Sequence, residues 1–249
     1  MWLCENKLTP SVEKTKLMFI SPKKVGLLPD IYFNNQKLEW VSSIKYLGII
    51  IDRGLNFIKQ SQEVFKDLSK AYGTIYAISK FMPQSVLLKI YYAIVYPKLT
   101  QNVILWGGIK ESNKANIKIL INKILRSILH VKTDQNHRPL MHTDEMYKSL
   151  GLLKFDDIYQ YYLLRFIHFA FHGNETIFHE HFQPLIPSHD YPTRDVRILI
   201  PKARLEIEKQ SVIYQCCNLY NEIPQSFLEV QKTSHLKNNF KKFCIDRYL

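Results

Sequence analysis

The apolar positions change their spacing along the chain, and this change predicts two kinds of structure. Up to about position 53, short apolar runs alternate with turn-forming residues, which is typical of strands. We expect strands at residues 16–21, 31–33 and 37–41, with residues 34–36 joining the last two as a hairpin. Residues 45–52 form the strongest strand candidate, because a continuous β-branched run suits a buried strand.

After Gly54 the apolar residues recur at spacings of three and four, which predicts amphipathic helices. The first helix should bury residues from Val64 to Ile78 and end near Met82 and Pro83. A second helix should follow with Val86, Leu87, Ile90, Tyr91 and Ile94 inward and an interruption at Pro97. A third should bury Ile117, Leu120, Ile121, Ile124, Leu125 and Ile128, with Lys114, Lys118, Lys123 and Arg126 on its outer face.

The remainder of the chain has a mixed pattern. Residues 155–171 are apolar almost all round, which marks a buried helix, residues 183–231 should be irregular, and a last helix should cover 234–248. We therefore expect an α+β fold: a small antiparallel sheet, a mainly α-helical region and a mixed C-terminal segment. Boundaries near 53–54 and 133–138 would divide the chain into residues 1–53, 54–133 and 134–249.

The composition is that of a folded, packed protein, and the distribution of charge indicates where a partner could bind. The 249 residues are 46% hydrophobic and 22% charged, which is typical of a globular chain. Of the net charge of +12, residues 54–133 contribute +9, because they hold 12 Lys and Arg against three Asp and Glu. Positive charge concentrated in this way indicates an anionic partner.

Lysines along the first two predicted helices are the best candidates to meet that partner. These lysines are Lys59, Lys66, Lys70, Lys80, Lys89 and Lys98, with Tyr72, Tyr76, Tyr91, Tyr92 and Tyr96 interleaved among them. Lysines with nearby aromatic rings can follow a phosphate backbone and pack against sugars or bases. The alternative is a solvated helix face above core tyrosines, although solvated faces normally mix both charge signs.

Cysteine and histidine patterns do not favour a metal site. The four cysteines form no C-x-x-C pair, so reduced thiols in an intracellular protein are expected. His168 and His172 share a helix face, with His179 and His181 close behind, but zinc sites usually add cysteines or a carboxylate, so we expect packed aromatic surroundings instead. No segment has the pattern of a signal peptide or a membrane span.

Four blocks, in order, resemble one known family. Residues 6–16 (NKLTPSVEKTK), residues 44–52 (IKYLGIIID), and residues 88–100 with 105–107 (LKIYYAIVYPKLT and LWG) are similar to segments of jockey-like non-LTR retrotransposon reverse transcriptases, which are RNA-directed DNA polymerases. Residues 189–194 (HDYPTR), Pro201, Ser211 and residues 221–224 (NEIP) resemble the C-terminal part of the same open reading frames. The chain departs from that pattern at Gln101, Asn102, Cys216 and Tyr220.

The resemblance implies that the chain contains the end of the palm (residues 1–53), a basic helical thumb (54–133) and the following segment. The carboxylates that bind Mg²⁺ in the parent enzyme would then lie before Met1, so we expect a truncated polymerase, inactive alone and without a cofactor. It further implies a cytoplasmic ribonucleoprotein and the nucleus as the sites of action.

Individual roles follow from the same resemblance. Tyr46, Leu47 and Gly48 correspond to the primer grip, where glycine lets the backbone approach another chain closely. Lys14 and Lys16 resemble lysines of the palm's closing motif, and Lys14 is assigned the accessory role of protonating or steadying the departing pyrophosphate. The six lysines named above and Arg126 would bind the backbone of RNA and of an RNA–DNA hybrid.

Asp156 and Asp157 superficially resemble the missing metal-binding pair. They come after the YLG block rather than before it, and they open an apolar helical run. Acidic residues at that place stabilise a helix N-terminus by about 0.5–2 kcal/mol. We therefore expect a structural role for both.

Two functions are consistent with these observations. The first is to hold template RNA and the growing DNA strand during target-primed reverse transcription. The alternative is a non-enzymatic interaction protein derived from a transposon fragment, which would associate with itself or with full-length polymerase through exposed apolar surface.

Overall fold

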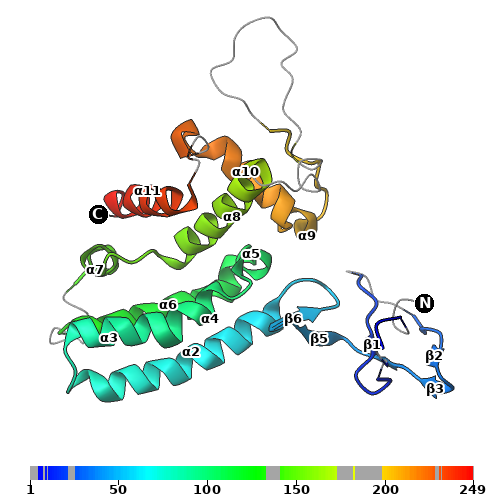
Figure 1. Ribbon diagram of the computed structural model, residues 1–249. Coiled ribbons are helices and arrows are strands. Elements are labelled where there is room, and N and C mark those ends of the chain that lie inside the picture. Colours follow the sequence, from blue (N-terminus) through cyan, green and yellow to red (C-terminus); the bar gives the residue numbers. More distant parts are fainter. Residues whose placement is uncertain are drawn as a thin grey trace, which may run out of the picture.

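The computed structural model describes residues 5–7, 9, 11–21, 26–132, 141–172, 182, 198–227, 230 and 232–248. It has an α+β fold, with short strand pairs in the N-terminal part and helices in the rest, as the sequence predicts. Figure 1 shows the strands beside one end of the longest helix, with the remaining helices layered over that helix. The boundary predicted near residues 133–138 lies outside the described residues.

The strands that the structure describes pair two by two. β1 (Lys16–Leu17) pairs in parallel with β4 (Glu39–Trp40), and β2 (Tyr32–Phe33) pairs antiparallel with β3 (Gln36–Lys37). Asn34 and Asn35, with φ of 49° and 60°, make the tight turn of this hairpin, as predicted. The parallel pair was not predicted, and the strand expected at 16–21 is only two residues long.

Residues 45–52 do not form the single strand that their β-branched run predicts. They belong to an antiparallel hairpin of β5 (Ser43–Tyr46) and β6 (Ile49–Asp52). Leu47 and Gly48 turn the chain with φ of 46° and 83°, and this left-handed conformation suits glycine far better than a residue with a side chain. Tyr46 pairs with Ile49 across the turn.

Asp52 fixes this hairpin to the first long helix, α2 (Ile58–Ser79). Its Oδ1 accepts hydrogen bonds from the backbone N–H of Gly54 (3.0 Å) and Asn56 (3.2 Å), and its Oδ2 accepts one from Phe57 (2.7 Å). The buried side chain of Gln60 adds a second link, because its Oε1 accepts from the N–H of Ile50 at 2.8 Å. The hairpin and α2 are therefore held together at a polar junction.

A helical bundle follows from α2. The other members are α3 (Gln84–Ile90), η1 (Tyr91–Val95), α4 (Tyr96–Thr100), α5 (Val103–Trp106) and α6 (Glu111–Leu129). In Figure 1 the chain runs away from the hairpin along α2, returns through α3 and α4, and runs out again along α6. The inward faces predicted for α2 and α6 are confirmed, since Leu68, Ile75, Ile117, Ile124 and Ile128 are fully buried.

Pro97 does not interrupt the second helix as expected. It sits in the first turn of α4, directly after the π-helical segment Tyr91–Val95, and the N–H of Tyr96 bonds to the carbonyl of Tyr91. A wider turn accommodates a residue that has no N–H and whose ring would clash with the preceding helical carbonyl. The helix therefore continues, but its side chains change phase at this point.

The C-terminal part is more helical than the sequence predicts. It contains α7 (Thr143–Leu150), α8 (Phe155–His172), α9 (Glu206–Lys209), α10 (Val212–Glu222), the short 3-10 helix η3 (Gln225–Phe227) and α11 (Thr233–Asp246). α8 packs against α10, α11 and α5, which confirms it as a buried helix. Residues 212–222 were expected to be irregular, yet Ser211 caps a helix there by accepting from the N–H of Tyr214. None of the described helices is both long and apolar enough to cross a membrane.

Candidate nucleic-acid interface

The tip of the β5–β6 hairpin projects into solvent and is anchored from behind. Tyr46 and Leu47 expose 60% and 79% of their surface. Asn102, at the start of α5, donates from Nδ2 to the carbonyl of Leu47 at 3.2 Å. Gly48 has φ of +83°, which favours glycine, and a Cβ atom added there would lie 2.3 Å from Nε2 of Gln101, so the end of that side chain would have to move.

This contact brings two of the sequence blocks together. The YLG block supplies the hairpin tip, and the block that contains Gln101, Asn102 and Trp106 supplies its support. Trp106 is fully buried, and its Nε1 donates to the carbonyl of Gln101 at 3.0 Å. Sequence reasoning treated Gln101 and Asn102 only as departures from a pattern, and nothing in their spacing indicated that they hold the turn.

Between the hairpin, α2 and α4 lies a cleft of about 180 Å³. Lys45 and Gly48 line it from the hairpin, Glu63 and Asp67 from α2, and Lys98 from α4. Lys45 is exposed, and sequence reasoning did not include it among the binding residues although it stands next to Tyr46. The cleft joins the hairpin tip to the charged side of α2.

We call Lys59, Lys66 and Lys70 the α2 lysine face. Their spacings of seven and four residues place them on one side of the helix, opposite the buried Leu68 and Ile75. All three are exposed, and Lys59 donates to Oγ of Ser43 in β5 at 2.8 Å, so the face reaches the hairpin. Within the described part of the chain, the side-chain ammonium groups of Lys66 and Lys70 form no hydrogen bond or ion pair, although the charge of Lys70 acts on Asp67.

Lys80 and Lys89 lie at the other end of the bundle. Lys80 follows the last turn of α2, and Lys89 stands in the last turn of α3. Both are exposed, and neither is paired with any residue that the structure describes. Lys59 and Lys80 are separated by roughly 30 Å along α2, given the rise of about 1.5 Å per helical residue.

Lys98 differs from the other predicted binding lysines, because it forms an ion pair. Its Nζ lies 2.9 Å from Oδ2 of Asp67, which links α4 to α2. The hydrogen bond from Lys98, helped by the charges of Lys98, Lys70 and Lys45, holds the pKa of Asp67 below its usual value. The charge of Lys98 is therefore partly neutralised by Asp67, and the surrounding lysines favour the ionised form of Asp67.

The tyrosines of the second helix line a pocket to which none of the predicted binding lysines contributes. Tyr91 is buried, with 1% of its surface exposed, and Tyr92 and Tyr96 line a pocket on the side facing α8 and α11. Tyr72 and Tyr76 pack against each other on α2 with ring centroids 5.8 Å apart, and Tyr76 is exposed. The burial of Tyr91 agrees with its predicted inward position, whereas the pocket around Tyr92 and Tyr96 depends on residues of α8 and α11.

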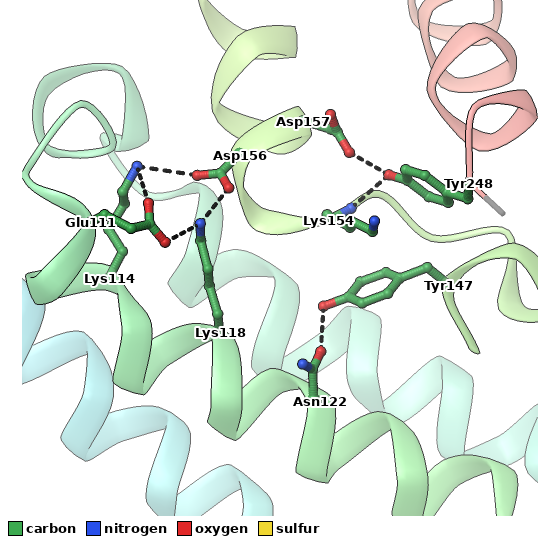
Figure 2. A network of polar contacts seen from close by, with 9 residues as sticks. All are labelled: Glu111, Lys114, Lys118, Asn122, Tyr147, Lys154, Asp156, Asp157 and Tyr248. Carbon is green, nitrogen blue, oxygen red and sulfur yellow. Dashed lines mark hydrogen bonds and ion pairs between the residues drawn. The ribbon is translucent and has the colours of Figure 1, made fainter. Parts of the chain in front are cut away.

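Two lysines of α6, Lys114 and Lys118, do not point outward as expected (Figure 2). Lys114 Nζ lies 3.1 Å from Oδ1 of Asp156 and 3.4 Å from Oε2 of Glu111, and Lys118 pairs with the same two carboxylates. Burial opposes the charged form of Asp156, but the hydrogen bonds and charges of Lys118 and Lys114 outweigh it, so the pKa of Asp156 is lowered. These two lysines hold α6 to α8.

Arg126, the remaining candidate on α6, is half-buried. Its Nε is buried without a hydrogen-bond partner among the described residues. Its positive charge lies near Tyr147 of α7, which in turn donates from its hydroxyl to Oδ1 of Asn122 at 3.1 Å. Lys123 is the member of the expected outer face that is exposed.

Asp156 and Asp157 lie in the first turn of α8, which confirms the predicted helix-terminal placement. Asp157 accepts a hydrogen bond from the hydroxyl of Tyr248 near the chain end (Figure 2), and burial raises its pKa despite that bond. Both carboxylates are thus tied to structural partners. No group of three or more histidine, cysteine or acidic side chains that could hold a metal ion occurs among the residues the structure describes.

His168 and Lys16 contact residues of neighbouring elements, whereas Lys14 is exposed. His168 is buried, with Nε2 2.7 Å from the carbonyl oxygen of Val230, and its ring centroid lies 4.6 Å from that of His172 with the two planes tilted by 46°. His179 and His181 lie outside the described residues. Lys16 pairs with Glu39 across the β1–β4 pair at 2.5 Å. Lys14 is exposed in the turn before β1.

Comparisons with known proteins add no relative. The chain matches no protein-family model, no curated protein and no solved structure. The family resemblance and the roles that follow from it stay predictions.

Proposed function

We propose that this chain binds RNA and RNA–DNA hybrids through their phosphate backbone, as the thumb of a non-LTR retrotransposon reverse transcriptase would hold template and primer. The observation that carries the proposal is the α2 lysine face, whose exposed Lys66 and Lys70 have no acidic partner in the described part of the chain. Unpaired like charges repel one another, so their grouping on one side favours an anionic partner.

The hairpin defines one end of this surface. Lys45, Lys59 and the cleft beside Gly48 connect the exposed tip to the α2 lysine face. A strand end resting against Tyr46 and Leu47 would meet an aromatic ring and an aliphatic side chain on a turn that Asn102 holds in place. This arrangement supports the primer-grip role proposed for the hairpin.

Contacts of this kind position a duplex without reading its sequence. Lysine ammonium groups bind phosphate oxygens as point charges, and the affinity then depends strongly on salt. The contact is ionic and needs no metal ion. We propose that such binding takes place in a cytoplasmic ribonucleoprotein and in the nucleus, and that the Mg²⁺-dependent chemistry belongs to the parent polymerase.

A salt titration tests the proposal. The full chain would be titrated against a fluorescently labelled RNA–DNA hybrid by anisotropy at several salt concentrations. Three to four phosphate contacts predict a slope of roughly −3 in a plot of log affinity against log salt, at about 0.9 per contact. Binding no tighter than that of a neutral protein of similar size, or a slope near zero, would contradict the proposal.

A second candidate function is that of a non-enzymatic interaction protein that associates with itself or with full-length polymerase. It is favoured by exposed apolar side chains in the N-terminal part, among them Ile20, Leu27 and Tyr32. Size-exclusion chromatography with light scattering separates the two candidates. A monomer that binds hybrid supports the nucleic-acid function, whereas an oligomer that binds none supports the second.

A further inference from the structure

A pocket of about 350 Å³ lies on a different side of the bundle from the α2 lysine face. Its walls come from η1 and α4, from the turn between α7 and α8, and from α8 and α11. No residue of α2 or of the hairpin lines it. It is therefore separate from the surface proposed above and joins the basic bundle to the C-terminal helices.

Tyrosine rings form one wall of this pocket. Tyr92 lies edge-on to Tyr91, with ring centroids 5.6 Å apart, and is 5.6 Å from Tyr96 on its other side. Tyr161 of α8 lines the pocket as well, beside the apolar side chain of Ile158. Tyr92 is partly exposed, so a flat ring can reach it from solvent.

Two lysines of α11 line the pocket. Lys237 and Lys241 are one helical turn apart, the first exposed and the second half-buried, and neither has an acidic partner in the part of the chain that the structure describes. Lys241 reaches across to the α7–α8 turn, since a Cβ added at Gly151 would lie 3.8 Å from its Nζ. Gly151 has φ of +59° and ends α7 in the left-handed conformation.

We propose that this pocket binds a single nucleotide, with the base against the tyrosine rings and the phosphate between Lys237 and Lys241. The chemistry is complementary, because aromatic rings stack on a base of any sequence and two neighbouring ammonium groups attract phosphate oxygens. The volume lies at the small end of the range for ligand sites, roughly 300–1,000 Å³, which suits one nucleotide rather than a longer segment. The nucleotide is either free or the unpaired end of a nucleic-acid strand.

The test measures direct binding of small probes to the full chain. Isothermal titration with AMP, adenosine, phenyl phosphate and a single-stranded hexauridylate would be run on the wild type and on five variants. Lys237→Ala with Lys241→Ala should weaken AMP or hexauridylate binding at least tenfold, and Tyr92→Ala should weaken it several-fold while Tyr92→Phe keeps it. Lys242→Ala is the matched control, since Lys242 is exposed on α11 but does not line the pocket.

The outcomes separate the sources of the ligand. Binding of AMP identifies a free nucleotide, and binding of hexauridylate alone identifies a strand end; either supports the proposal if the pocket variants lose it. Equal affinity for phenyl phosphate or for adenosine would overturn it, as would undiminished binding by the lysine double variant. The variant Lys66→Ala with Lys70→Ala should bind these probes normally, so loss of hybrid binding and loss of nucleotide binding are distinguishable.

Discussion

α2 and α6 are the two long basic helices of the bundle, and they use their lysines in opposite ways. They pack directly against each other, and both bury an apolar face. Lys66 and Lys70 of α2 are exposed and unpaired within the described residues, whereas Lys114 and Lys118 of α6 expose only 12% and 27% of their side chains and are paired with carboxylates. The charges of Lys66 and Lys70 are therefore available to a partner, whereas those of Lys114 and Lys118 are already neutralised by carboxylates.

The difference arises from tertiary structure rather than from the helices themselves. Glu111 lies in the first turn of α6, and Asp156 comes from the start of α8, far along the chain. Together they neutralise Lys114 and Lys118 and join two helices. On α2, Glu63 and Asp67 are the corresponding carboxylates, and within the described residues Asp67 is the one that forms an ion pair, with Lys98. A count of basic residues along the sequence cannot distinguish these two situations.

Removing two exposed lysines from α2 is the strongest test of the difference between α2 and α6. Lys66→Ala with Lys70→Ala is expected to lower the affinity for an RNA–DNA hybrid by roughly 30-fold at low salt and to make the salt slope shallower by about 2, one for each phosphate contact. Because both side chains are exposed and unpaired in the described structure, the free energy of unfolding should change by less than about 0.5 kcal/mol. Anisotropy titration and urea denaturation measure the two effects.

The control for this variant carries the same loss of charge at another place. Lys123→Ala with Lys242→Ala removes two exposed lysines, one from α6 and one from α11. It should lower the affinity for the hybrid by no more than a few-fold. Equal losses in the two double variants would mean that only the net charge matters and that α2 has no special role.

Removing Asp156, which pairs with both Lys114 and Lys118, should lower stability and leave the affinity for hybrid unchanged. Asp156→Ala would leave Lys114 and Lys118 in partly buried positions with only Glu111 to pair with. We expect the free energy of unfolding to fall by about 1–2 kcal/mol, less than for a fully buried pair because nearly half of the Asp156 side chain meets solvent. The affinity for hybrid should stay the same, and a rise in that affinity would show that α6 lysines are released for binding.

The sequence predicts the helices well because their apolar spacing is a local property. α2, α6 and α8 lie where the spacing places them, with the expected residues inside. The hairpin was misread because the β-branched run continues through the turn at Leu47 and Gly48. The apolar pattern therefore gave the strand residues but not the point at which the chain reverses.

The candidate site could be predicted less completely, because charge availability depends on distant partners. The α2 lysine face follows from spacing alone, but the pairing of Lys98 with Asp67 and the inward direction of Lys114 and Lys118 do not. Tyr92 and Tyr96 line another pocket, whose other walls come from α8, α11 and the turn between α7 and α8. Each of these features concerns a residue whose position depends on another element.

Removing the ion-pair partner of Lys98 should raise the affinity for hybrid, the opposite of removing the α2 lysines. Asp67→Asn removes the carboxylate that neutralises Lys98 and that lies in the field of Lys45 and Lys70, so the net positive charge around the cleft rises by one. We expect the affinity for hybrid to rise about threefold at low salt, since one further cation becomes available next to the hairpin. Anisotropy titration measures the change, with Glu63→Gln in the same cleft as a comparison. Weaker binding by Asp67→Asn would place the nucleic acid away from this cleft.

The smallest expected effect is the pH dependence of the α6–α8 junction. The pKa of Glu111 is held down by its hydrogen bond with Lys118, and that of Asp156 by both lysines despite burial. Groups with lowered folded pKa values stabilise the fold above their unfolded values, near pH 4, and lose this contribution as pH falls through the folded values. Asp157 acts with the opposite sign, because burial raises its pKa and its ionisation opposes folding as pH rises.

Asp157→Asn isolates these two opposing contributions. Asparagine keeps an oxygen that can accept the hydrogen bond from Tyr248 but has no charge to bury. The wild type should therefore gain stability relative to the variant as pH falls from 6 towards 4, by on the order of 0.5 kcal/mol, and both should lose stability below pH 4 as Asp156 and Glu111 are protonated. Urea denaturation at each pH measures both curves. Parallel curves between pH 6 and 4 would show that Asp157 is not the carboxylate with the raised pKa, and that the junction responds to pH through Asp156 and Glu111.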